Sequence, residues 1–320
     1  MTRRVIALIL IILAIVLAVG SILTLTPAGG GLRTLIFPAP TPTPVPILTP
    51  EGTPPAINAP SAFLLDADTG RTLVNIQGDQ QVPMASTTKI MTAIIALEKG
   101  NLNQVVTIKQ NAVDEVKKNN GSSAQLVVGD QIRLRDLIYG LMLPSGDDAA
   151  ITIAEAVSGS TAGFVTLMNQ YAQRLRLKHT HYINPDGLTY YDAQGKPDPG
   201  HYSSAADLAQ LTRYALANSL FAQIVQLQQY NLAPTAEHHA YEWKTTNTLL
   251  SSYPGATGVK TGFTVEADYC LVFSATNGGH HLVGAVMKEK EENKRFADAK
   301  ALLDWGFNLP LKPPPPTPQP

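Results

Sequence analysis

The chain has 320 residues, a formal net charge of -1 and 44% hydrophobic residues. This balance suits a globular protein, and it shows neither the excess of Lys and Arg typical of a nucleic-acid-binding protein nor an acidic tail. We therefore expect no nucleic-acid partner.

The N-terminus predicts a transmembrane anchor over residues 1–26. Two arginines precede an apolar run that extends from Val5 to about Leu25. About 20 apolar residues span the roughly 30 Å hydrocarbon core of a bilayer, and the arginines would stay on the cytoplasmic side. A signal peptide cleaved after Gly20 is the alternative interpretation. In both cases the rest of the chain is exported.

Prolines dominate the two stretches that flank the central part of the chain. Residues 27–60 carry a proline at nearly every second or third position in segments such as FPAPTPTPVP. This composition favours extended polyproline II and predicts a linker that reaches on the order of 100 Å when fully extended. Residues 310–320 predict a proline-rich tail. The folded domain is therefore expected over residues 61–309.

The first part of this domain predicts a hairpin and then a helical lobe. Two apolar runs around a DTG turn predict a β-hairpin over residues 61–76. Apolar residues then recur at helical spacing in four segments, at 87–97, 134–143, 147–157 and 162–177. Residues 203–216 predict a further helix, with serines that can cap its start.

The C-terminal third changes to strands. Two apolar runs, at 267–276 and 280–288, are separated by Asn-Gly-Gly, which is a strong hairpin signal. Residues 292–307 return to helical spacing and would cover one face of the sheet. The order of elements predicts an α+β fold, in which an antiparallel sheet takes strands from both ends of the domain and is flanked by helices.

The cysteine and the histidines predict neither a catalytic nucleophile nor a metal site. The single cysteine, Cys270, lies in the apolar run YCLVFSA and is expected to be a small buried hydrophobic residue. The seven histidines form no metal-ligand pattern, so we expect neither a metal nor a cofactor.

The stretch PMASTTKIMT places Ser86 three residues before Lys89 at the predicted start of a buried helix. At this spacing both side chains lie on one face, about one turn apart. A lysine there can take the serine's proton if it is neutral, which requires burial or a neighbouring cation. The pair predicts a serine nucleophile with a lysine base.

Two further stretches support this interpretation. LMLPSGDDAA places Ser145 in a turn between two predicted helices, where its hydroxyl can point into a cleft. GVKTGFT places Lys260 and Thr261 near the C-terminal strands, where they could bind a carboxylate, and Gly262 would let a ligand approach closely.

These stretches resemble the motif set of the serine D-alanyl-D-alanine carboxypeptidases, the low-molecular-mass penicillin-binding proteins. The three motifs, in the family's order, are Ser86-Thr-Thr-Lys89, Ser145-Gly-Asp147 and Lys260-Thr-Gly262. NPDGL at 184–188, YSSAADLAQL at 202–211 and the segment from KTGF to LLDWGF are also similar. The resemblance covers nearly all of residues 61–308. It implies the penicillin-binding protein/β-lactamase-like transpeptidase fold.

The resemblance also implies roles for the motif residues. Ser86 would attack the carbonyl between two D-alanines, Lys89 would be the general base and Ser145 would relay protons to the leaving amine. Lys260 and Thr261 would hold the terminal carboxylate, and the N–H groups of Ser86 and Phe263 would form the oxyanion hole. The implied partners are peptidoglycan stem peptides ending in D-Ala-D-Ala, with β-lactams as covalent inhibitors, in a bacterial cell envelope.

Two features depart from the family pattern. Family members with a second, β-rich domain and a C-terminal anchor continue past the helix that ends in WGF, whereas this chain continues into prolines, which suggests a tether at the N-terminus instead. Asp147 stands where the family usually has asparagine, and a carboxylate cannot donate to the substrate as an amide can. We expect its charge to favour the protonated form of Lys89 and to raise the acid limb of the pH profile.

Three other functions remain open from sequence. An endopeptidase that cuts peptidoglycan cross-links would share the motifs. A β-lactamase would share them too, although no convincing glutamate motif that activates the deacylating water follows downstream. A non-catalytic sensor that binds penicillin or the wall is the third, because Asp147 departs from the pattern.

Overall fold

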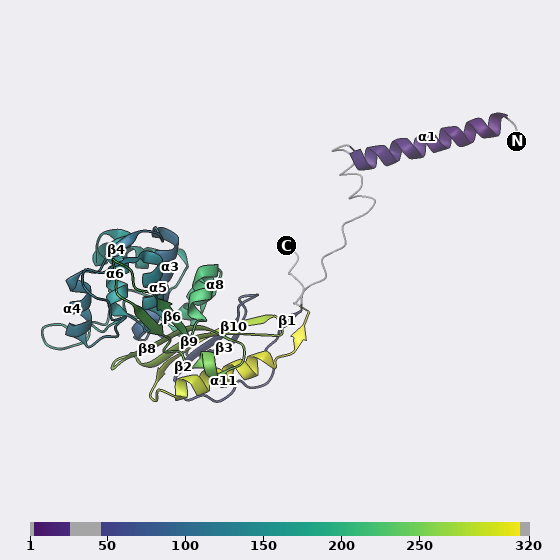
Figure 1. The fold of residues 1–320 in the computed structure, drawn as a ribbon. Helices are drawn as coiled ribbons and strands as arrows, with labels where there is room; N and C mark the ends of the chain where they lie inside the picture. Colours follow the sequence, from purple (N-terminus) through teal and green to yellow (C-terminus); the bar gives the residue numbers. More distant parts are fainter. Residues whose placement is uncertain (1–2, 26–45, 314–320) are drawn as a thin grey trace. The chain divides into compact units, whose positions relative to one another are not determined.

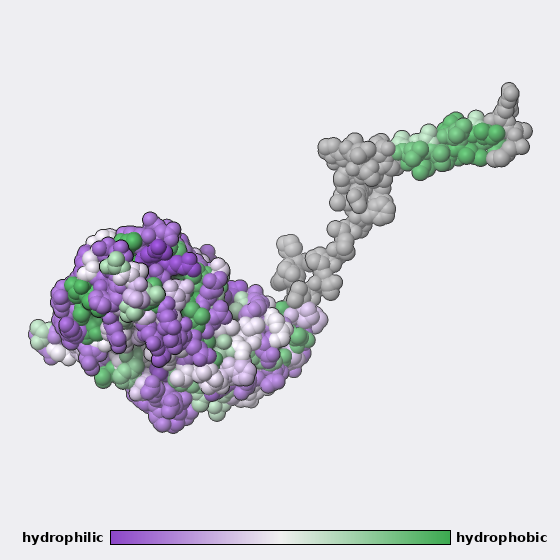
Figure 2. Space-filling model, in the orientation of Figure 1, coloured by the Kyte–Doolittle hydropathy of each residue, from purple (hydrophilic) through white to green (hydrophobic). Residues whose placement is uncertain are grey.

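The computed structural model describes residues 3–25 and 46–313, which belong to two separate compact units, Met1–Pro46 with Pro313–Pro320 and Ile47–Lys312. In the first unit the described element is helix α1, Arg3–Leu25. Along residues 5–18 of this helix the apolar side chains are exposed, and Figure 2 shows this part as a continuous hydrophobic surface. Most of the predicted linker and the tail from residue 314 onward lie outside the described residues.

Among the helices of residues 3–25 and 46–313, none taken singly combines the length and the hydropathy of a membrane span. The segments Asp147–Ser158 and Thr161–Arg174 meet these criteria only together, as a pair bent by 85°, and Val5–Ala18 is a shorter apolar helix.

The second unit is built on a five-stranded antiparallel sheet with the order β3-β2-β10-β9-β8 (Figure 1). Its strands come from the two ends of the unit, which confirms the predicted α+β architecture and both predicted hairpins. The strands are β2 (Ser61–Asp66), β3 (Thr72–Ile76), β8 (Ala256–Thr264), β9 (Asp268–Asn277) and β10 (His280–Glu289).

Both faces of this sheet are covered by other parts of the fold. Successive side chains of a strand point to opposite faces and therefore enter different cores. In β10, Val283 and Ala285 join the core shared with the helical lobe, whereas Leu282 and Val286 join the core beneath α11 (Lys294–Phe307). This explains why the strands are apolar runs rather than alternating ones. Cys270 is buried on the lobe side, as predicted.

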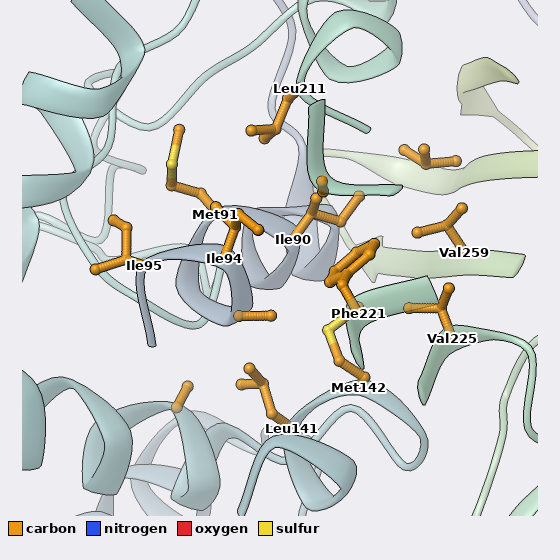
Figure 3. Packing of buried hydrophobic residues seen from close by; sticks show 14 of the residues in the cluster. Ile90, Met91, Ile94, Ile95, Leu141, Met142, Leu211, Phe221, Val225 and Val259 are labelled. Atoms are coloured by element: carbon orange, nitrogen blue, oxygen red, sulfur yellow. The ribbon is translucent and has the colours of Figure 1, made fainter. Parts of the chain in front are cut away.

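The helical lobe surrounds one central helix. Helix α3 is buried over nearly its whole length and packs against its neighbours through residues such as Ile90, Met91 and Ile94 (Figure 3). The predicted lobe is confirmed. Its helices are α3 (Lys89–Lys99), α5 (Leu134–Met142), α6 (Asp147–Ser158) and α7 (Thr161–Arg174), and α8 (Ala205–Leu216) joins the lobe to the sheet.

Several elements escaped prediction because their residues are polar, exposed or few. Helix α4 buries only one side chain, and β4 and β5 have only three residues each. Strand β7 buries alternate residues, Tyr241 and Trp243, but it is only four residues long. They are α4 (Gln110–Asn119), β4 (Val105–Thr107) with β5 (Gln131–Arg133), α9 (Ser219–Val225), β6 (Gln229–Leu232) with β7 (Tyr241–Lys244), and α10 (Leu249–Ser252).

The folded unit extends beyond the predicted boundaries of 61 and 309. Strand β1 (Ile47–Leu48) pairs with β11 (Leu311–Lys312), so part of the predicted linker and tail belongs to the fold. The Asp298 carboxylate of α11 also accepts hydrogen bonds from the backbone N–H groups of Asn58 and Ala59. These contacts between the two ends could not be predicted from a proline-rich composition.

Candidate active site

The candidate nucleophile lies in a tight turn. Ser86 belongs to the 3₁₀ segment η1, Ala85–Thr88, and α3 begins only at Lys89, whereas a helix over 87–97 was predicted. The hydroxyls of Thr87 and Thr88 donate to the carbonyls three residues earlier, at 2.6 and 2.7 Å, and such local bonds favour 3₁₀ geometry. Ala85 has a φ of 48°, in the left-handed region that costs a non-glycine residue energy.

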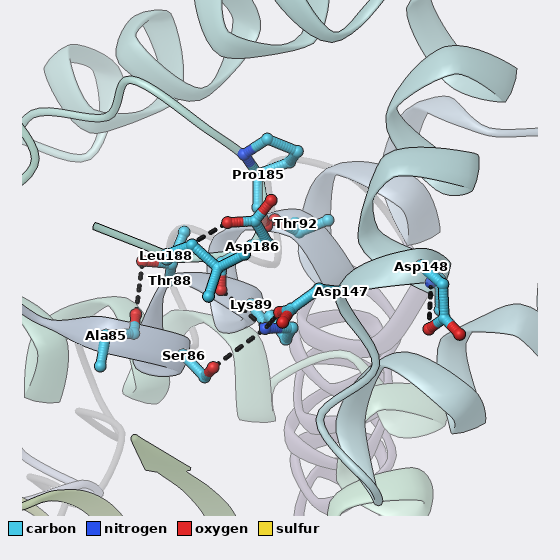
Figure 4. A network of polar contacts seen from close by, with 12 residues as sticks. Ala85, Ser86, Thr88, Lys89, Thr92, Asp147, Asp148, Pro185, Asp186 and Leu188 are labelled. Atoms are coloured by element: carbon cyan, nitrogen blue, oxygen red, sulfur yellow. Dashed lines mark hydrogen bonds and ion pairs between the residues drawn. The ribbon is translucent and has the colours of Figure 1, made fainter. Parts of the chain in front are cut away.

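Lys89 is fully buried and directed at the serine. Its Nζ lies 3.0 Å from Ser86 Oγ, 2.5 Å from Asp147 Oδ1 and 2.7 Å from the carbonyl oxygen of Asp186 (Figure 4). The structure therefore brings together the predicted serine and lysine, and it adds two oxygen partners. An amine so enclosed has a fixed position for proton exchange with the serine hydroxyl.

Asp147 begins α6 and faces the lysine rather than the solvent. Burial raises the pKa of the Asp147 carboxyl above its ordinary value, and the charge of Lys89 opposes this effect. The neighbouring Asp148 points elsewhere, because it accepts hydrogen bonds from the N–H of Ala124 at 2.9 Å and from Ser123 Oγ at 2.8 Å. The departure from the family motif thus lies within the candidate site.

Ser145 occupies the turn between α5 and α6, as predicted. Its φ of 68° is in the left-handed region, and its side chain is buried beside the cleft. Among the residues that the structure describes, none is a hydrogen-bond partner for Ser145 Oγ. A buried hydroxyl without a protein partner suits one that exchanges protons with a ligand.

Lys260 and Thr261 lie on the edge strand β8. Burial, together with the charge of Lys89, lowers the pKa of Lys260 well below its ordinary value. Lys260 Nζ donates to the carbonyl of Thr261 at 3.0 Å, and Thr261 Oγ1 lies 2.5 Å from Thr246 Oγ1. Thr246 was not predicted, since only the pairing of distant segments brings it to this strand.

Gly262 allows β8 to approach the nucleophile turn. A Cβ atom on Gly262 would lie 3.1 Å from the carbonyl oxygen of Met84 and 3.2 Å from Ser86 N. The turn η1 is therefore a close neighbour of this glycine, and the close approach of a ligand stays a prediction, since Gly262 also lines the cleft described below. Phe263 is 53% exposed and packs on Tyr269 with the rings tilted by 30° and 4.5 Å between their centroids.

A cleft of about 350 Å³ joins these groups. Two of its charged residues, Glu292 and Arg295, were not predicted as site residues. The Arg295 side chain is buried, and its Nη1 donates to the carbonyl of Gly262 at 3.2 Å. The cleft is lined by Ser86, Asn120, Gly121, Ser122, Ser145, Asp147, Leu188, Thr246, Thr261, Gly262, Phe263, Tyr269, Glu292 and Arg295.

The NPDGL stretch forms a loop that closes over the turn. Burial, together with the charge of Asp147, raises the pKa of the Asp186 carboxyl to about 7. Gly187 has a φ of 93°, and a Cβ atom there would lie only 2.0 Å from the carbonyl oxygen of Ala85. Sequence marked this stretch as a turn, but nothing local indicates that it meets Lys89, which lies 97 positions away.

The site combines a serine paired with a buried lysine, a second serine and a strand that carries a lysine and a threonine, all on an α+β fold. This combination defines the class of active-serine acyl-transfer proteins. The family model for D-alanyl-D-alanine carboxypeptidases matches residues 49–291. The chain belongs to this family.

Individual relatives agree with the family assignment. A D-alanyl-D-alanine carboxypeptidase of a Streptomyces strain is 39% identical over 80% of this chain and 90% of its own length. One of Bacillus subtilis is 34% identical over 79% of this chain, but the match spans only 63% of that relative.

Solved structures are similar as well. The crystal structure of a Streptomyces DD-transpeptidase matches with a TM-score of 0.75 and 40% identity, covering 81% of this chain and all of the other. The crystal structure of a D-alanyl-D-alanine carboxypeptidase from Mycobacterium tuberculosis matches with a TM-score of 0.72 and 30% identity, covering 82% and 96%.

Proposed function

We propose that the chain removes the terminal D-alanine from peptidoglycan stem peptides through an acyl-enzyme. The observation that carries this proposal is the 3.0 Å contact between Lys89 Nζ and Ser86 Oγ at a cleft that Ser145 and Thr261 also line. Family membership supplies the substrate class, and the bond cleaved is the peptide bond between two D-alanines. β-Lactams that mimic this dipeptide would acylate the same serine.

In the proposed acylation, Ser86 Oγ attacks the carbonyl carbon while its proton passes to neutral Lys89. The N–H groups of Ser86 and Phe263 would stabilise the oxyanion. The peptide C–N bond then breaks, and the leaving D-alanine amine takes a proton through Ser145. Water next attacks the ester, which releases the shortened peptide and restores the serine.

Cationic and hydroxyl groups at β8 would hold the substrate's terminal carboxylate. Thr261 and Arg295 both line the cleft, and Lys260 precedes Thr261 on the strand. Burial lowers the pKa of Lys260. The negative charge of a bound carboxylate would act in the opposite direction and favour the protonated lysine. Arg295 keeps its charge and adds a directional donor.

Incubation of the purified domain with a stem pentapeptide tests the proposal. Mass spectrometry should show loss of one alanine, with water as the acceptor. Cleavage of a cross-linked dimer in preference to the pentapeptide would assign an endopeptidase instead. Covalent penicillin binding without turnover of either peptide would assign the sensor.

A second candidate is transfer of the acyl group to an amine. The observation that favours it is the 40% identity to a structure described as a DD-transpeptidase. Adding D-alanine in isotope-labelled form, or glycine, to the pentapeptide reaction distinguishes the two. A dominant transfer product would assign a transpeptidase, and a dominant tetrapeptide would assign the carboxypeptidase.

We further propose that α1 anchors the protein to the cytoplasmic membrane with the catalytic domain outside it, in a bacterial cell envelope. The helix has 23 residues, so at 1.5 Å per residue it is about 34 Å long, close to the hydrocarbon thickness of a bilayer. The apolar side chains of residues 5–18 are exposed, and two arginines precede them in the sequence.

The anchor predicts that intact protein sediments with membranes and keeps its first residues. Cell fractionation followed by N-terminal analysis of the mature protein measures this. A soluble mature form that begins at about Ser21 would show a cleaved signal peptide instead.

A further inference from the structure

His201 takes no part in the chemistry proposed above, yet it is buried against the nucleophile turn. It lies before α8, in a segment bridged to residues 181 and 82. Its Nε2 is 2.7 Å from Thr88 Oγ1, and Thr88 Oγ1 is 2.7 Å from the carbonyl oxygen of Ala85. We propose that His201, acting through Thr88, orients the Ala85–Ser86 peptide so that the Ser86 N–H faces the oxyanion. This inference rests on the proposed acyl-transfer function.

The contacts fix the direction of each hydrogen bond. The backbone N–H of Ile183 donates to His201 Nδ1 at 3.2 Å, so Nδ1 carries no proton. Burial lowers the pKa of His201 to about 3, and the imidazole therefore stays neutral at physiological pH. Nε2–H must then donate to Thr88 Oγ1, which leaves the threonine hydroxyl to donate to the carbonyl of Ala85.

The last acceptor belongs to the same peptide unit as the proposed oxyanion donor. A peptide unit is planar and trans, so the C=O of Ala85 and the N–H of Ser86 point in opposite directions in one plane. Holding the oxygen therefore sets the direction of the N–H. A hydrogen bond to the carbonyl also polarises the amide and strengthens its N–H as a donor.

The surrounding backbone leaves this peptide little freedom to turn. The left-handed φ of Ala85 is a strained conformation that needs external support. Gly187 packs on the carbonyl side, where any side chain would collide with the oxygen of Ala85. On the other side Gly262 lies against Ser86 N, at the strand that carries the second proposed oxyanion donor, Phe263.

Three variants distinguish the proposed hydrogen-bond chain from a role of His201 and Thr88 in packing alone. His201→Gln can place an amide N–H near the position of Nε2 and keep the bond to Thr88, whereas His201→Asn can keep only the acceptor for Ile183. Thr88→Val removes the hydroxyl and preserves the shape. His280→Asn, at the distant β9–β10 turn, controls for loss of a histidine.

Because the missing interaction acts in the transition state, kcat should fall and KM should stay constant. We expect a loss of about tenfold in kcat on the pentapeptide for His201→Asn and for Thr88→Val, the effect of losing one hydrogen bond worth about 1.4 kcal/mol. His201→Gln should stay within about threefold of the native enzyme. The His201→Asn/Thr88→Val double variant should be no slower than either single variant, since both break one chain.

The inference is overturned if His201→Asn has the same kcat as His201→Gln, or if the substitutions raise KM instead of lowering kcat. It is also overturned if the effects of His201→Asn and Thr88→Val on kcat add in the double variant. Thr88→Val keeps the test decisive should a His201 variant unfold, which thermal melting reports. The second-order rate of penicillin acylation provides a separate readout, because it uses the same N–H group. A native enzyme that leaves the pentapeptide intact counts against the proposed function, whereas equal penicillin acylation by all variants counts against the inference.

Discussion

Replacing Ser86 with alanine is expected to abolish covalent labelling by a fluorescent penicillin and to lower pentapeptide turnover by at least about a thousandfold. The substitution removes the hydroxyl oxygen that is proposed to form the acyl bond. Gel fluorescence after denaturation measures the covalent adduct. Labelling that survives this substitution would show that another nucleophile reacts.

The fold should tolerate this change. Ser86 Oγ contributes one contact to Lys89, and Lys89 keeps its bonds to Asp147 and to the Asp186 carbonyl. The free energy of unfolding should therefore change by no more than about 1 kcal/mol. Ser145→Ala is the matched control, because it should slow labelling without preventing it. Thermal melting of both variants separates loss of the nucleophile from loss of structure.

Replacing Asp147 with asparagine should move the acid limb of kcat/KM to lower pH. The carboxylate lies 2.5 Å from Lys89 Nζ, where its negative charge favours the protonated lysine that cannot act as a base. Opposite charges at such distances shift protonation by about 1–3 pH units. With the charge removed, the protonated amine loses its ion-pair partner, so the variant would keep activity further into acid than the native enzyme.

Other charges face this pair and limit the size of the shift. Burial raises the pKa of Asp147 itself, so the pair titrates as a unit and the acid limb reports on both groups. Burial and the charge of Lys89 lower the pKa of Lys260, and the Asp186 carboxyl has a pKa raised to about 7. The direction of the shift follows from the direct contact with Asp147, which is the nearest of these charges.

Profiles of kcat/KM against pH for the two enzymes measure this shift. Asp148→Asn is a matched control, since it removes an adjacent carboxylate that binds Ser123 and Ala124 rather than a lysine. Its acid limb should move less than that of Asp147→Asn, because Asp148 affects Asp147 only through its charge. Superimposable native and Asp147→Asn profiles, or an upward move in the variant, would contradict the prediction.

Local sequence was sufficient for much of the fold. Apolar residues at helical spacing predicted the lobe helices, and the Asn-Gly-Gly signal predicted the β9–β10 hairpin, because these elements are long and their cores are continuous. Element order predicted an antiparallel sheet with strands from both ends. The three-residue spacing of Ser86 and Lys89 also predicted their contact, since one helical turn separates them.

Tertiary structure alone decided which groups complete the site. The motif resemblance predicted that Asp147 lies near Lys89, but Asp186 comes from a loop, and no local pattern predicts that its carbonyl meets this lysine. The relay from His201 to Ala85 likewise depends on two segments that are 113 positions apart. Folding pairs these buried polar groups because an unpaired one would cost about 1–3 kcal/mol, and which partner satisfies each of them depends on how the whole chain packs.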